Sequence, residues 1–449
     1  MDFLYELEWR GLLQDMSPGL EEALAKGTVT GYIGFDPTAP SLTIGNYVPI
    51  MLLKLFQLSG HQPIVLMGGA TGRIGDPSGK DKERELKSYD ELDTNLEHQK
   101  KQMFKLLDFE REGNPAILVN NLDFYKDMPV LEFLRTVGKT LTVNYMMSKE
   151  SVQKRLETGI SFTEFSYQLL QAYDFQCLYS QHHCILQMGG SDQWGNITSG
   201  TEFIRRNLQE KAYALTNPLL TKADGSKFGK STEGNIWLDP ALTSPYKFYQ
   251  FWINSNDDDL PKLTRYFTLK SREEVEAMEQ KHAGNPQELK RLLAEELTIR
   301  IHGEEAYRSV LNVTELLFGR NAGRAELLQL SQEELATVAQ EIPSYTIPAE
   351  AIASGVQILD LLAELTPITA SKGEARRAIQ NNAISVNKEK IASHEAVIPA
   401  GELLHHRYLM IENGKKNKYL VQTGDGGWET VDRGRETVDG GREAGGGEF

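Results

Sequence analysis

A strand that runs straight into a helix constrains this chain more than any other stretch of its sequence. Residues 29–35 are rich in β-forming side chains, and residues 44–58 are almost wholly apolar and long enough for a helix. Asp36 and Pro37 favour a turn between them, and Gly45 lets another group approach the backbone closely. Because the first N–H groups of a helix have no partner within it, such a start suits a phosphate. Joints of this kind are also common in α/β domains without any ligand there.

Strands and helices alternate through the first half of the chain. The sequence predicts a buried strand at 63–67, a helix that ends at about residue 107 and another strand at 116–119. This alternation favours an α/β fold, with a parallel sheet covered by helices on both faces. Ligands then bind beyond the carboxyl ends of the strands. At 449 residues, the chain is too long for one core and should hold two to four domains.

Two glycine-rich loops imitate the phosphate-binding loop of nucleotide hydrolases, and both depart from its spacing. In residues 68–80, Ile74 stands where the first glycine belongs, and Asp81 replaces the hydroxyl residue that would hold magnesium. In residues 222–231, three residues instead of four separate Gly225 from the final Gly-Lys-Ser. Neither loop is therefore a nucleotide P-loop, and the second one is either a flexible basic loop with a function or an exposed hairpin.

One predicted helix carries a polar stripe. Ser161 and Glu164 form a capping-box pattern at its start. Further along, Tyr167, Gln171 and Asp174 follow one another at i, i+4 and i+7 and so share one face. A polar stripe is usually a solvated face, but this one contains no Lys or Glu and lies in an aromatic-rich helix. The stripe therefore indicates the wall of a pocket.

The composition excludes several classes of protein. A formal net charge of −15 argues against general nucleic-acid binding, although a basic patch can still be local. No apolar run reaches transmembrane length without a charge, and the acidic N-terminus is not a signal peptide. The two cysteines, Cys177 and Cys184, fit a reducing cytoplasm and exclude a four-cysteine zinc site. A metal cluster with His182 and His183 is disfavoured, because adjacent residues on a strand point to opposite faces.

The C-terminal part of the chain differs in charge from the rest. The proline-bearing residues 341–348 predict a linker, and residues 355–422 predict a small separate domain. Residues 353–421 contain nine Lys/Arg and seven Asp/Glu, a net charge of +2. Cations cluster at a helix start in residues 371–377. A solvated helix is the alternative, but a basic patch in an acidic chain favours RNA. From residue 423 the tail is mostly Gly, Arg and Glu and is expected to be disordered.

Taken in order, these pieces resemble the bacterial tyrosyl-tRNA synthetases, a class I aminoacyl-tRNA synthetase family. The resemblance runs from about residue 3 to residue 422 and leaves out only the tail. It rests on specific motifs, the last of which is similar to the Lys-Met-Ser-Lys-Ser signature of the family: Gly34-Phe-Asp-Pro-Thr38, Gly68-Gly-Ala-Thr-Gly72, Gly75-Asp-Pro-Ser78, Val143-Asn-Tyr-Met146, Gly159–Phe165, Gly189–Asn196 and Lys227-Phe-Gly-Lys-Ser231.

The resemblance implies the domain organisation. A Rossmann-like parallel-sheet catalytic domain is expected over residues 1–220. A signature-loop linker and an α-helical anticodon-binding domain are expected over residues 221–342. A small α+β RNA-binding domain, of a type shared with a ribosomal protein, is expected over residues 353–421, followed by the disordered tail at 422–449.

The chain departs from the family at one signature. The family's His-Ile-Gly-His appears here as Thr43-Ile-Gly-Asn46, and the nearest other histidine is His61. Thr43 keeps a hydroxyl donor, and Asn46 keeps an amide N–H roughly where an imidazole N–H would stand. Donation to a phosphate can therefore survive without ionisable groups. The departure bears on the catalytic rate more than on the identity of the family.

The implied reaction has two steps. The carboxylate of tyrosine attacks the α-phosphorus of ATP, which gives tyrosyl-adenylate and pyrophosphate, and the tyrosyl group then passes to the terminal ribose of tRNA(Tyr). Because the substrate supplies the nucleophile, the protein positions the reactants and stabilises charge on the leaving pyrophosphate. Magnesium is expected with ATP, held mainly by phosphates, and no structural metal is expected. The side chains implied for this catalytic work are Thr38, Thr43, Asn46, Lys80, Arg84, Lys227, Lys230 and Ser231.

The resemblance also implies how tyrosine is selected. Asp174 accepts the phenol proton and Tyr32 supplies a second hydrogen bond to the phenol. The α-amino group meets Tyr167, Gln171 and Asp76, with Gln187 nearby. The complete tyrosine-binding set is Tyr32, Asp76, Tyr167, Gln171, Asp174 and Gln187. The ATP-binding set is Asp36, Gly45, Gly190, Asp192, Gln193 and Lys230, with Asn121 and Thr71 as weaker additions to the site.

Partners follow from the same resemblance. We expect a cytoplasmic homodimer, with residues 130–147 in the contact between copies, and no contact with a membrane. The expected ligands are L-tyrosine, ATP and tRNA(Tyr). The side chains expected to bind RNA are Lys372, Arg376, Arg377, Lys388, Lys415 and Lys416.

Three alternatives are open at this point. A tryptophanyl-tRNA synthetase is disfavoured by Asp174 and by the C-terminal RNA module. A small-molecule nucleotidyltransferase shares the ATP signature but not the second signature loop or the module. A catalytically impaired RNA-binding relative would explain the two missing histidines, but it would not need the retained Tyr32 and Asp174. An ATP–pyrophosphate exchange assay with tyrosine, with tryptophan and without amino acid separates these possibilities.

Overall fold

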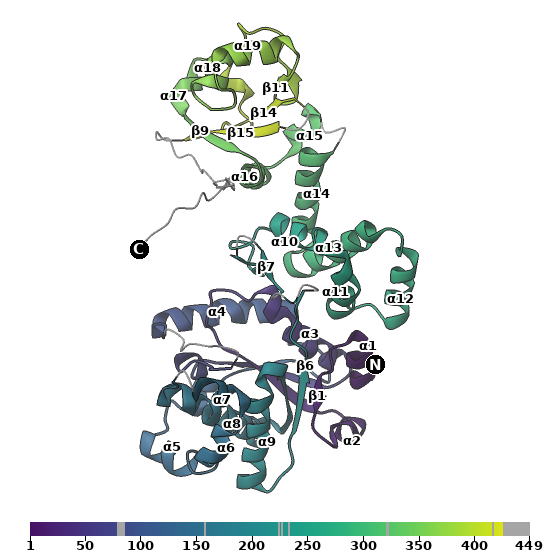
Figure 1. Cartoon of the computed structure of the whole chain (residues 1–449), viewed down its shortest axis with the longest axis vertical. Coiled ribbons are helices and arrows are strands. Elements are labelled where there is room, and N and C mark those ends of the chain that lie inside the picture. Colours follow the sequence, from purple (N-terminus) through teal and green to yellow (C-terminus); the bar gives the residue numbers. More distant parts are fainter. Residues whose placement is uncertain are drawn as a thin grey trace, which may run out of the picture. The chain divides into compact units, whose positions relative to one another are not determined.

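The computed structural model of the chain divides into two compact units, residues 1–307 and residues 308–449 (Figure 1). The residues that it describes are 1–78, 86–156, 159–222, 225, 228–231, 234–319, 323–414 and 417–424. No helix in this described part is long and apolar enough to cross a membrane. The predicted tail lies outside the described residues from residue 425 onward. The finer domain boundaries expected from the sequence stay predictions.

The first unit is built on a six-stranded sheet with the strand order β1-β6-β5-β2-β3-β4. Five strands are parallel, and β1 pairs antiparallel with β6 at one edge. The sheet grows from β2 toward β3 and β4 on one side and toward β5 and β6 on the other. This arrangement confirms the predicted α/β fold, and ligands are expected where the strand order reverses, between β2 and β5. The strands are β1 (Asp15–Met16), β2 (Thr30–Phe35), β3 (Gln62–Met67), β4 (Ile117–Asn120), β5 (Cys184–Gly190) and β6 (Tyr213–Asn217).

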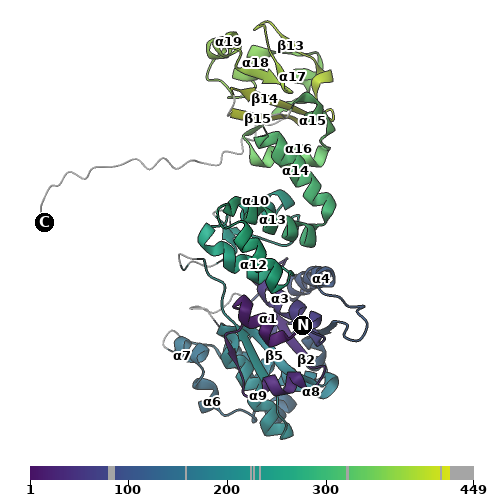
Figure 2. The ribbon, with the colours of Figure 1, turned by 90° about the vertical axis from the view of Figure 1, so that its right-hand side faces the viewer.

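Helices cover both faces of this sheet (Figure 2). Along β2, Tyr32 faces Phe175 of α8, with the ring centroids 5.2 Å apart. Gly31 faces the other side, where a Cβ atom would lie 3.0 Å from Phe56 of α3. Because successive strand residues alternate between faces, one strand contacts both helix layers. The helices around the sheet are α1 (Phe3–Arg10), α2 (Leu20–Ala25), α3 (Ile44–Leu58), α4 (Tyr89–Leu106), α5 (Val130–Thr136), α6 (Val143–Met147), α7 (Glu150–Leu156), α8 (Phe162–His182) and α9 (Trp194–Leu208).

The rest of the first unit is helical apart from a short hairpin. The hairpin pairs β7 with β8, and it precedes helices whose buried faces are rich in aromatic rings such as Trp252 and Phe267. These elements are β7 (Lys230–Ser231), β8 (Gly234–Asn235), α10 (Pro245–Ile253), α11 (Leu260–Phe267), α12 (Arg272–Lys281), α13 (Pro286–His302) and the start of α14 (Glu304–Phe318).

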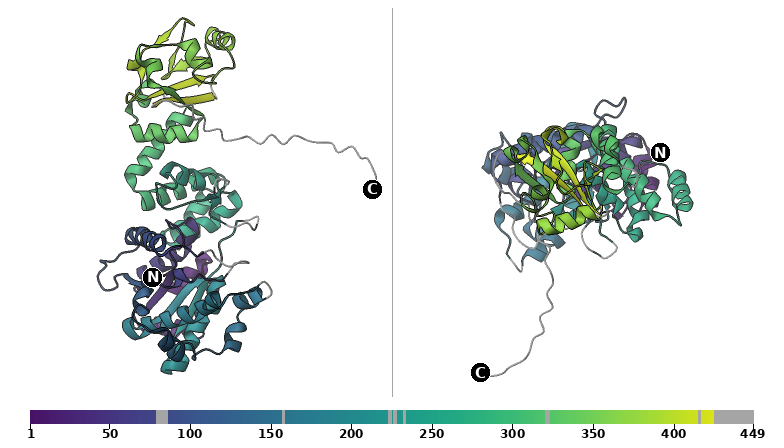
Figure 3. Two further views of the ribbon diagram at one scale, coloured as in Figure 1. Left: turned by 90° about the vertical axis from the view of Figure 1, so that its left-hand side faces the viewer. Right: turned by 90° about the horizontal axis from the view of Figure 1, so that it is seen from above.

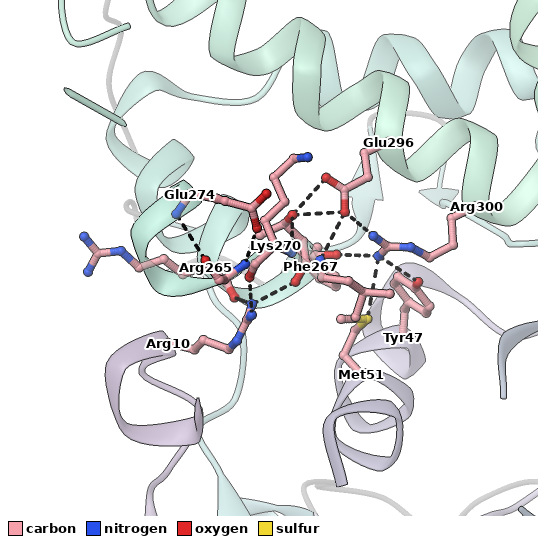
Figure 4. A network of polar contacts seen from close by, with 12 residues as sticks. Arg10, Tyr47, Met51, Arg265, Phe267, Lys270, Glu274, Glu296 and Arg300 are labelled. Atoms are coloured by element: carbon pink, nitrogen blue, oxygen red, sulfur yellow. Dashed lines mark hydrogen bonds and ion pairs between the residues drawn. The ribbon is translucent and has the colours of Figure 1, made fainter. Parts of the chain in front are cut away.

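Two arginines tie these helices to the sheet part of the same unit (Figure 4). Arg10 on α1 is buried and donates to the carbonyl of Arg265 at 2.7 Å, near the end of α11. Arg300 on α13 donates to the carbonyl of Phe267 at 2.5 Å and to the hydroxyl of Tyr47 at 3.4 Å. The last carbonyls of a helix lack partners within it, so a guanidinium there is favourable. Since Tyr47 belongs to α3, the helix that starts at the strand ends is fixed to the helical part.

The second unit contains a five-stranded sheet with the order β12-β11-β14-β15-β9 (Figure 3). Residues 344–348, which lie in the predicted linker, form β9 and pair in parallel with β15. The linker prediction was wrong here, because β9 is an edge strand, where Pro348 is tolerated. The elements are α15 (Arg324–Gln329), α16 (Gln332–Glu341), β9 (Ser344–Pro348), α17 (Ala349–Ala353), β10 (Val356–Gln357), α18 (Ile358–Ala363), α19 (Lys372–Gln380), β11 (Ile384–Val386), β12 (Glu389–Lys390), β13 (Val397–Ile398), β14 (Tyr408–Asn413) and β15 (Asn417–Gly424).

Candidate active site

The predicted pocket residues gather where the strand order reverses. Tyr32 lies in β2 and Asp36 directly follows it, while Gln187 lies in the neighbouring β5. Asp174 reaches this place from α8, the helix that packs on the same face of the sheet as Tyr32. Ser161 starts that helix by accepting a hydrogen bond from the N–H of Glu164 at 3.2 Å, as its capping pattern predicts. The polar stripe of α8 is therefore turned inward, with Tyr167 and Asp174 both buried, and its role as a pocket wall stays a prediction.

Asp174 is the buried acid of this pocket, with 1% of its surface exposed. Its Oδ1 accepts a hydrogen bond from the Tyr125 hydroxyl at 2.6 Å, and its Oδ2 accepts one from the Asn121 amide at 2.9 Å. The pKa of Asp174 is raised to about 7, chiefly by burial; the two hydrogen bonds oppose this rise, and the charge of Asp36 adds a smaller contribution to it. Such a carboxyl group is about half ionised at pH 7, and its ionised form accepts hydrogen bonds and keeps room for another donor.

A chain of hydrogen bonds joins Asp174 to Asp36. Besides Asp174, the Asn121 amide donates to Thr71 Oγ1 at 2.9 Å. The Thr71 hydroxyl donates in turn to Asp36 Oδ1 at 2.6 Å, and the Tyr167 hydroxyl donates to Asp36 Oδ2 at 2.9 Å. Thr71 and Asn121, which the sequence brought in only weakly, therefore connect these two acids of the site.

Gly68 makes this network possible. A Cβ atom at Gly68 would lie 2.0 Å from Asp36 Oδ1 and 2.6 Å from Thr71 Oγ1. Both distances are far below van der Waals contact, so any other residue would displace the carboxylate or the hydroxyl. The first glycine of the motif at 68–72 therefore leaves room for an acid of the site.

Three of the residues predicted to bind tyrosine have a buried polar atom with no hydrogen-bond partner in the described part of the chain. These atoms are the Tyr32 hydroxyl, Gln171 Oε1 and Gln187 Oε1. Tyr32 is fully buried, and burial together with the charge of Asp174 raises its pKa well above the ordinary value, so it stays protonated and able to donate. Buried polar groups normally find partners, so one donor and two acceptors without them indicate a place for a polar ligand.

Asp76 is a third acid of the site and is 8% exposed. Its carboxylate accepts hydrogen bonds from the Gln193 amide at 2.8 Å and from the N–H of Ser78 at 2.9 Å. The amide of Asn196 donates to Ser78 Oγ at 3.1 Å and lies 3.4 Å from Asp76 Oδ1. The structure thus brings together Asp76, predicted for tyrosine, and Gln193, predicted for ATP.

Thr43 and Asn46 form a reciprocal capping box at the start of α3. The N–H of Asn46 donates to Thr43 Oγ1 at 3.3 Å, and the N–H of Thr43 donates to Asn46 Oδ1 at 3.0 Å. The Thr43 hydroxyl also donates to Asn46 Oδ1 at 2.8 Å. The cap therefore occupies the hydroxyl that we expected to meet a phosphate. Asn46 is exposed, and its amide nitrogen makes no hydrogen bond to any residue that the structure describes.

The second signature loop returns to this helix start. The N–H of Ile44 donates to the carbonyl of Ile236 at 3.1 Å, and Thr43 forms a bridge with Trp237. A Cβ atom at Gly229 would lie 3.4 Å from the backbone nitrogen of Gly45, so the glycines allow the two signatures to approach each other closely. The backbone of Lys230 and Ser231 forms β7, whereas Lys80, Arg84 and Lys227 lie outside the described residues.

The glycine loop after β5 holds the other residues predicted for ATP. A Cβ atom at Gly190 would lie 2.6 Å from Oδ1 of Asp192, whose side chain is exposed. Thr38, in the turn after β2, is partly buried, and its N–H donates to the carbonyl of Asp36 at 2.8 Å. Their roles toward ATP stay predictions.

Two lysines predicted for RNA are paired with carboxylates in the second unit. Lys372 forms ion pairs with Asp360 and Glu364 at 2.5 and 2.7 Å. Lys388 pairs with Glu412 at 2.8 Å, and its side chain is 8% exposed. To meet a phosphate, Lys388 would have to leave a mostly buried partner, whereas the partly exposed pairs of Lys372 cost little to break; the RNA roles of both lysines stay predictions.

Two arginines of the same set are better placed. Arg376 and Arg377 are exposed on α19. Lys415 and Lys416 lie outside the described residues. Among the described cations of the set, the arginine pair presents the most accessible positive charge.

Tyr125, which donates a hydrogen bond to Asp174, was not among the residues predicted from the sequence. Its position just beyond the carboxyl end of β4 was the available signal, because ligands collect at that edge of a parallel sheet. Asn196 is the last residue of the motif at 189–196, but no role was predicted for it. Among the described residues, no group of three or more His, Cys, Asp and Glu is arranged to hold a metal ion.

Comparison with protein families gives two matches along the chain. Residues 24–319 match the family described as tRNA synthetases class I (W and Y), and residues 334–421 match the C-terminal domain of tyrosine–tRNA ligases. A tyrosine–tRNA ligase from Cytophaga hutchinsonii is 54% identical over 425 residues, which cover 94% of this chain and 99% of that protein. One from Bacteroides fragilis is 50% identical over 428 residues, with the same coverage of 94% and 99%.

A solved structure agrees with these relatives. The crystal structure of a C-terminally truncated mitochondrial tyrosyl-tRNA synthetase from Aspergillus nidulans superposes with a TM-score of 0.64 at 30% sequence identity. The superposition covers 71% of this chain and 94% of the fungal chain.

Proposed function

The chain belongs to the tyrosine–tRNA ligases of class I, and from this premise we propose that it activates L-tyrosine with ATP and transfers the tyrosyl group to tRNA(Tyr). One observation carries the proposal for the site. Asp174 is a buried carboxyl group near the Tyr32 hydroxyl, and three residues expected to bind tyrosine, Tyr32, Gln171 and Gln187, have a buried polar atom without a partner in the described part of the chain.

Tyrosine places its phenol between Asp174 and Tyr32. The Asp174 carboxylate accepts the phenol hydrogen, and the Tyr32 hydroxyl, which stays protonated, donates to the phenol oxygen. Phenylalanine would leave both groups buried without a partner, a penalty far larger than that of a missing methylene, and tyrosyl-tRNA synthetases are the standard example of this asymmetry.

The α-amino group of the substrate meets acceptors on the other side of the pocket. Its three N–H donors match the partnerless oxygens of Gln171 and Gln187 and the carboxylate of Asp76. Tyr167 adds a phenol oxygen, since its hydrogen is already donated to Asp36. In this arrangement the substrate carboxylate points toward the helix start and the glycine loop after β5.

Attack of that carboxylate on the α-phosphorus needs no nucleophile from the protein. The reactants are held in line, and donors stabilise charge on the departing pyrophosphate. We assign this work to Thr38, Asn46 and the N-terminal N–H groups of α3, together with Lys80, Arg84, Lys227, Lys230 and Ser231 of the two loops. Gly45, Gly190, Asp192 and Gln193 are assigned to the nucleotide.

Magnesium enters this scheme with its nucleotide. The ion is held mainly by the phosphates of ATP and not by a cage of protein ligands. Its chemistry there is to neutralise phosphate charge.

A second copy of the chain is the partner that the surface of α5 and α6 favours. Every residue of α5 is at least partly exposed, and four of its seven residues are apolar. Val130, Leu131 and Val143 are 70%, 76% and 59% exposed, and Phe162 nearby in the sequence is 74% exposed. Apolar residues gathered in this way mark interaction surfaces, so we propose that this segment forms the contact of a homodimer.

The setting proposed for the enzyme is the bacterial cytoplasm. Both cysteines are free, as in a reducing compartment. The arginine pair on α19 is proposed to contact the phosphates of tRNA(Tyr).

ATP–pyrophosphate exchange tests the proposal. With tyrosine, the purified chain should exchange labelled pyrophosphate into ATP. The exchange should be much weaker with phenylalanine, with tryptophan or without an amino acid. Charging of tRNA(Tyr) but not of tRNA(Trp) should follow. Exchange that depends on tryptophan, or exchange that needs no amino acid, would contradict it.

A further inference from the structure

The Tyr125 hydroxyl lies between two acceptors. It is 2.6 Å from Asp174 Oδ1 and 2.8 Å from the carbonyl oxygen of Leu170. Tyr125 follows the short turn Asn121–Phe124 after β4, so it meets Asp174 from a different element than α8. Its ring packs on Tyr173, with the centroids 5.8 Å apart. Nothing in the reaction proposed above requires this hydroxyl.

One hydroxyl hydrogen cannot satisfy both acceptors at once. When Asp174 is ionised, the hydrogen belongs on the carboxylate, because a charge-assisted hydrogen bond is the stronger one. When Asp174 is protonated, its own hydrogen can be donated to the oxygen of Tyr125, which then donates to the carbonyl of Leu170. Either state is fully hydrogen-bonded without movement of a heavy atom, so the orientation of Asp174 is fixed in both.

We propose that Tyr125 is a positioning residue for tyrosine recognition, which holds the Asp174 carboxylate in place and in its charged, accepting form when the substrate arrives. The inference rests on the proposed function and deepens it. Asn121 fixes Oδ2 from one side and Tyr125 fixes Oδ1 from the other, so the remaining lone pairs of the carboxylate point in defined directions.

The surroundings explain why the charged form needs this support. The titratable groups that face Asp174 are Tyr32 and Asp36 from β2 and the residue after it, Tyr125 from beyond β4, and Tyr167, Tyr173 and Cys177 from α8. Burial raises the pKa of each of these tyrosines and of Cys177, so they are neutral near pH 7. The charge of Asp36 opposes ionisation of Asp174, whereas hydrogen bonds from Tyr125 and Asn121 favour it.

Replacing the hydroxyl alone tests the inference. In Tyr125→Phe, the carboxylate loses one of its two stabilising donors, so its pKa should rise by about one unit. At low pH, kcat/KM for tyrosine in pyrophosphate exchange falls as Asp174 becomes protonated. This fall, the acid limb of the pH profile, should move to higher pH by the same amount. At pH 7, KM for tyrosine should rise about fivefold with little change in kcat, and at pH 8.5 it should return to within about twofold of the wild-type value.

Tyr173→Phe is the matched control, because Tyr173 packs on the same ring but makes no hydrogen bond to Asp174 among those described. Its acid limb should coincide with that of the wild type. A purely structural role for Tyr125 predicts a loss that is equal at pH 7 and pH 8.5, and this result would overturn the inference, as would an unshifted limb. Failure of the proposed function is separate, because then the wild-type chain itself would show no tyrosine-dependent exchange.

A second substitution covers the case in which Tyr125→Phe does not fold. 3-Fluorotyrosine at position 125 keeps the ring and the hydroxyl and makes the hydroxyl a stronger donor. The acid limb should then move to lower pH. A limb that stays in place, or that moves to higher pH, contradicts the assigned role.

Discussion

The amide nitrogen of Asn121 lies 2.9 Å from Oδ2 of Asp174 and donates a hydrogen bond to it. The same amide also donates to Thr71 Oγ1. The Asn121 side-chain oxygen accepts a hydrogen bond from the N–H of Ala70 at 2.7 Å. One neutral side chain therefore fixes a carboxylate, a hydroxyl and a loop at the carboxyl end of the sheet. This relationship makes the account of tyrosine recognition testable residue by residue.

Asn121→Ala should weaken tyrosine binding more than it weakens the fold. Asn121 supplies one of the two donors to the Asp174 carboxylate, as Tyr125 does, so we expect KM for tyrosine at pH 7 to rise by about fivefold or more. Asn114→Ala is the matched control, since Asn114 is also buried and donates to the carbonyls of Gln57 and His61 at 2.7 and 2.8 Å. The control should lower the thermal midpoint and leave KM unchanged. Equal effects of the two substitutions on KM would contradict the assignment.

Gly68→Ala should abolish activation in a chain that still folds. The new methyl group would start 2.0 Å from Asp36 Oδ1, so the carboxylate must move and the link to Tyr167 must break. We expect exchange activity to fall at least about 100-fold, because misplacement of about 1 Å at a site has effects of this size. Gly284→Ala, where a Cβ atom would meet no atom within 4 Å, should retain full activity. Pyrophosphate exchange and circular dichroism are measured on both variants. A folded Gly68→Ala variant that keeps its exchange activity would contradict the prediction.

Asp174→Asn should trade activity for stability, with a defined pH dependence. Burial raises the pKa of Asp174 from 3.8 to about 7. The stability gained from this raised pKa is fully present below pH 4 and is lost as the pH rises through 7, at about 1.4 kcal/mol per unit between the two values. The asparagine carries no charge, so the thermal midpoint of the variant relative to the wild type should increase between pH 5 and pH 8. Tyrosine activation, or its selectivity over phenylalanine, should be lost. A stability difference that does not change with pH would show that Asp174 ionises normally.

Asn46→Asp separates the two roles of Asn46. The carboxylate can still accept the hydrogen bonds of the capping box, and a negative charge suits a helix start, so the thermal midpoint should hold or rise. The substitution removes the amide donor and places an anion near the proposed pyrophosphate site, so the exchange rate should fall by about tenfold or more. Asn46→Ala should lower both the rate and the stability. If Asn46→Asp keeps the wild-type rate, Asn46 is a cap and not a donor.

Leu131→Lys should produce a monomer. Leu131 is 76% exposed, and a lysine there would place two charges in an apolar contact between copies. Leu328→Lys is the control, because Leu328 is 55% exposed in the second unit, outside the proposed contact. Sedimentation velocity should give a dimer for the wild type and for the control. A wild-type monomer, or an unaltered dimer of Leu131→Lys, would contradict the proposed interface.

The sequence predicted best what local patterns determine. The strand and helix on either side of Asp36, and the stripe from Tyr167 to Asp174, follow from β propensity and from helical spacing. The bond between Tyr125 and Asp174 joins residues 49 positions apart, and its existence depends on how a turn and a helix meet over the sheet. No local signal carries that information.

The errors have physical reasons as well. Residues 344–348 became an edge strand because β15, more than 70 positions later, offers a pairing partner, whereas prolines viewed locally indicate a linker. At the helix start, Thr43 and Asn46 fit the capping-box pattern, but we predicted from the sequence that their donors would bind a phosphate. The structure assigns the Thr43 hydroxyl to the cap, so the donor expected there is the Asn46 amide.

The central claim is that the pocket at the reversal of strand order binds tyrosine by its phenol, and a crystal structure with L-tyrosine tests it most directly. The phenol oxygen should lie within about 3 Å of both the Tyr32 hydroxyl and the Asp174 carboxylate, with the α-amino group near Asp76 and Gln171. A tyrosine whose phenol lies elsewhere, with the Tyr32 hydroxyl still without a partner, would contradict the account.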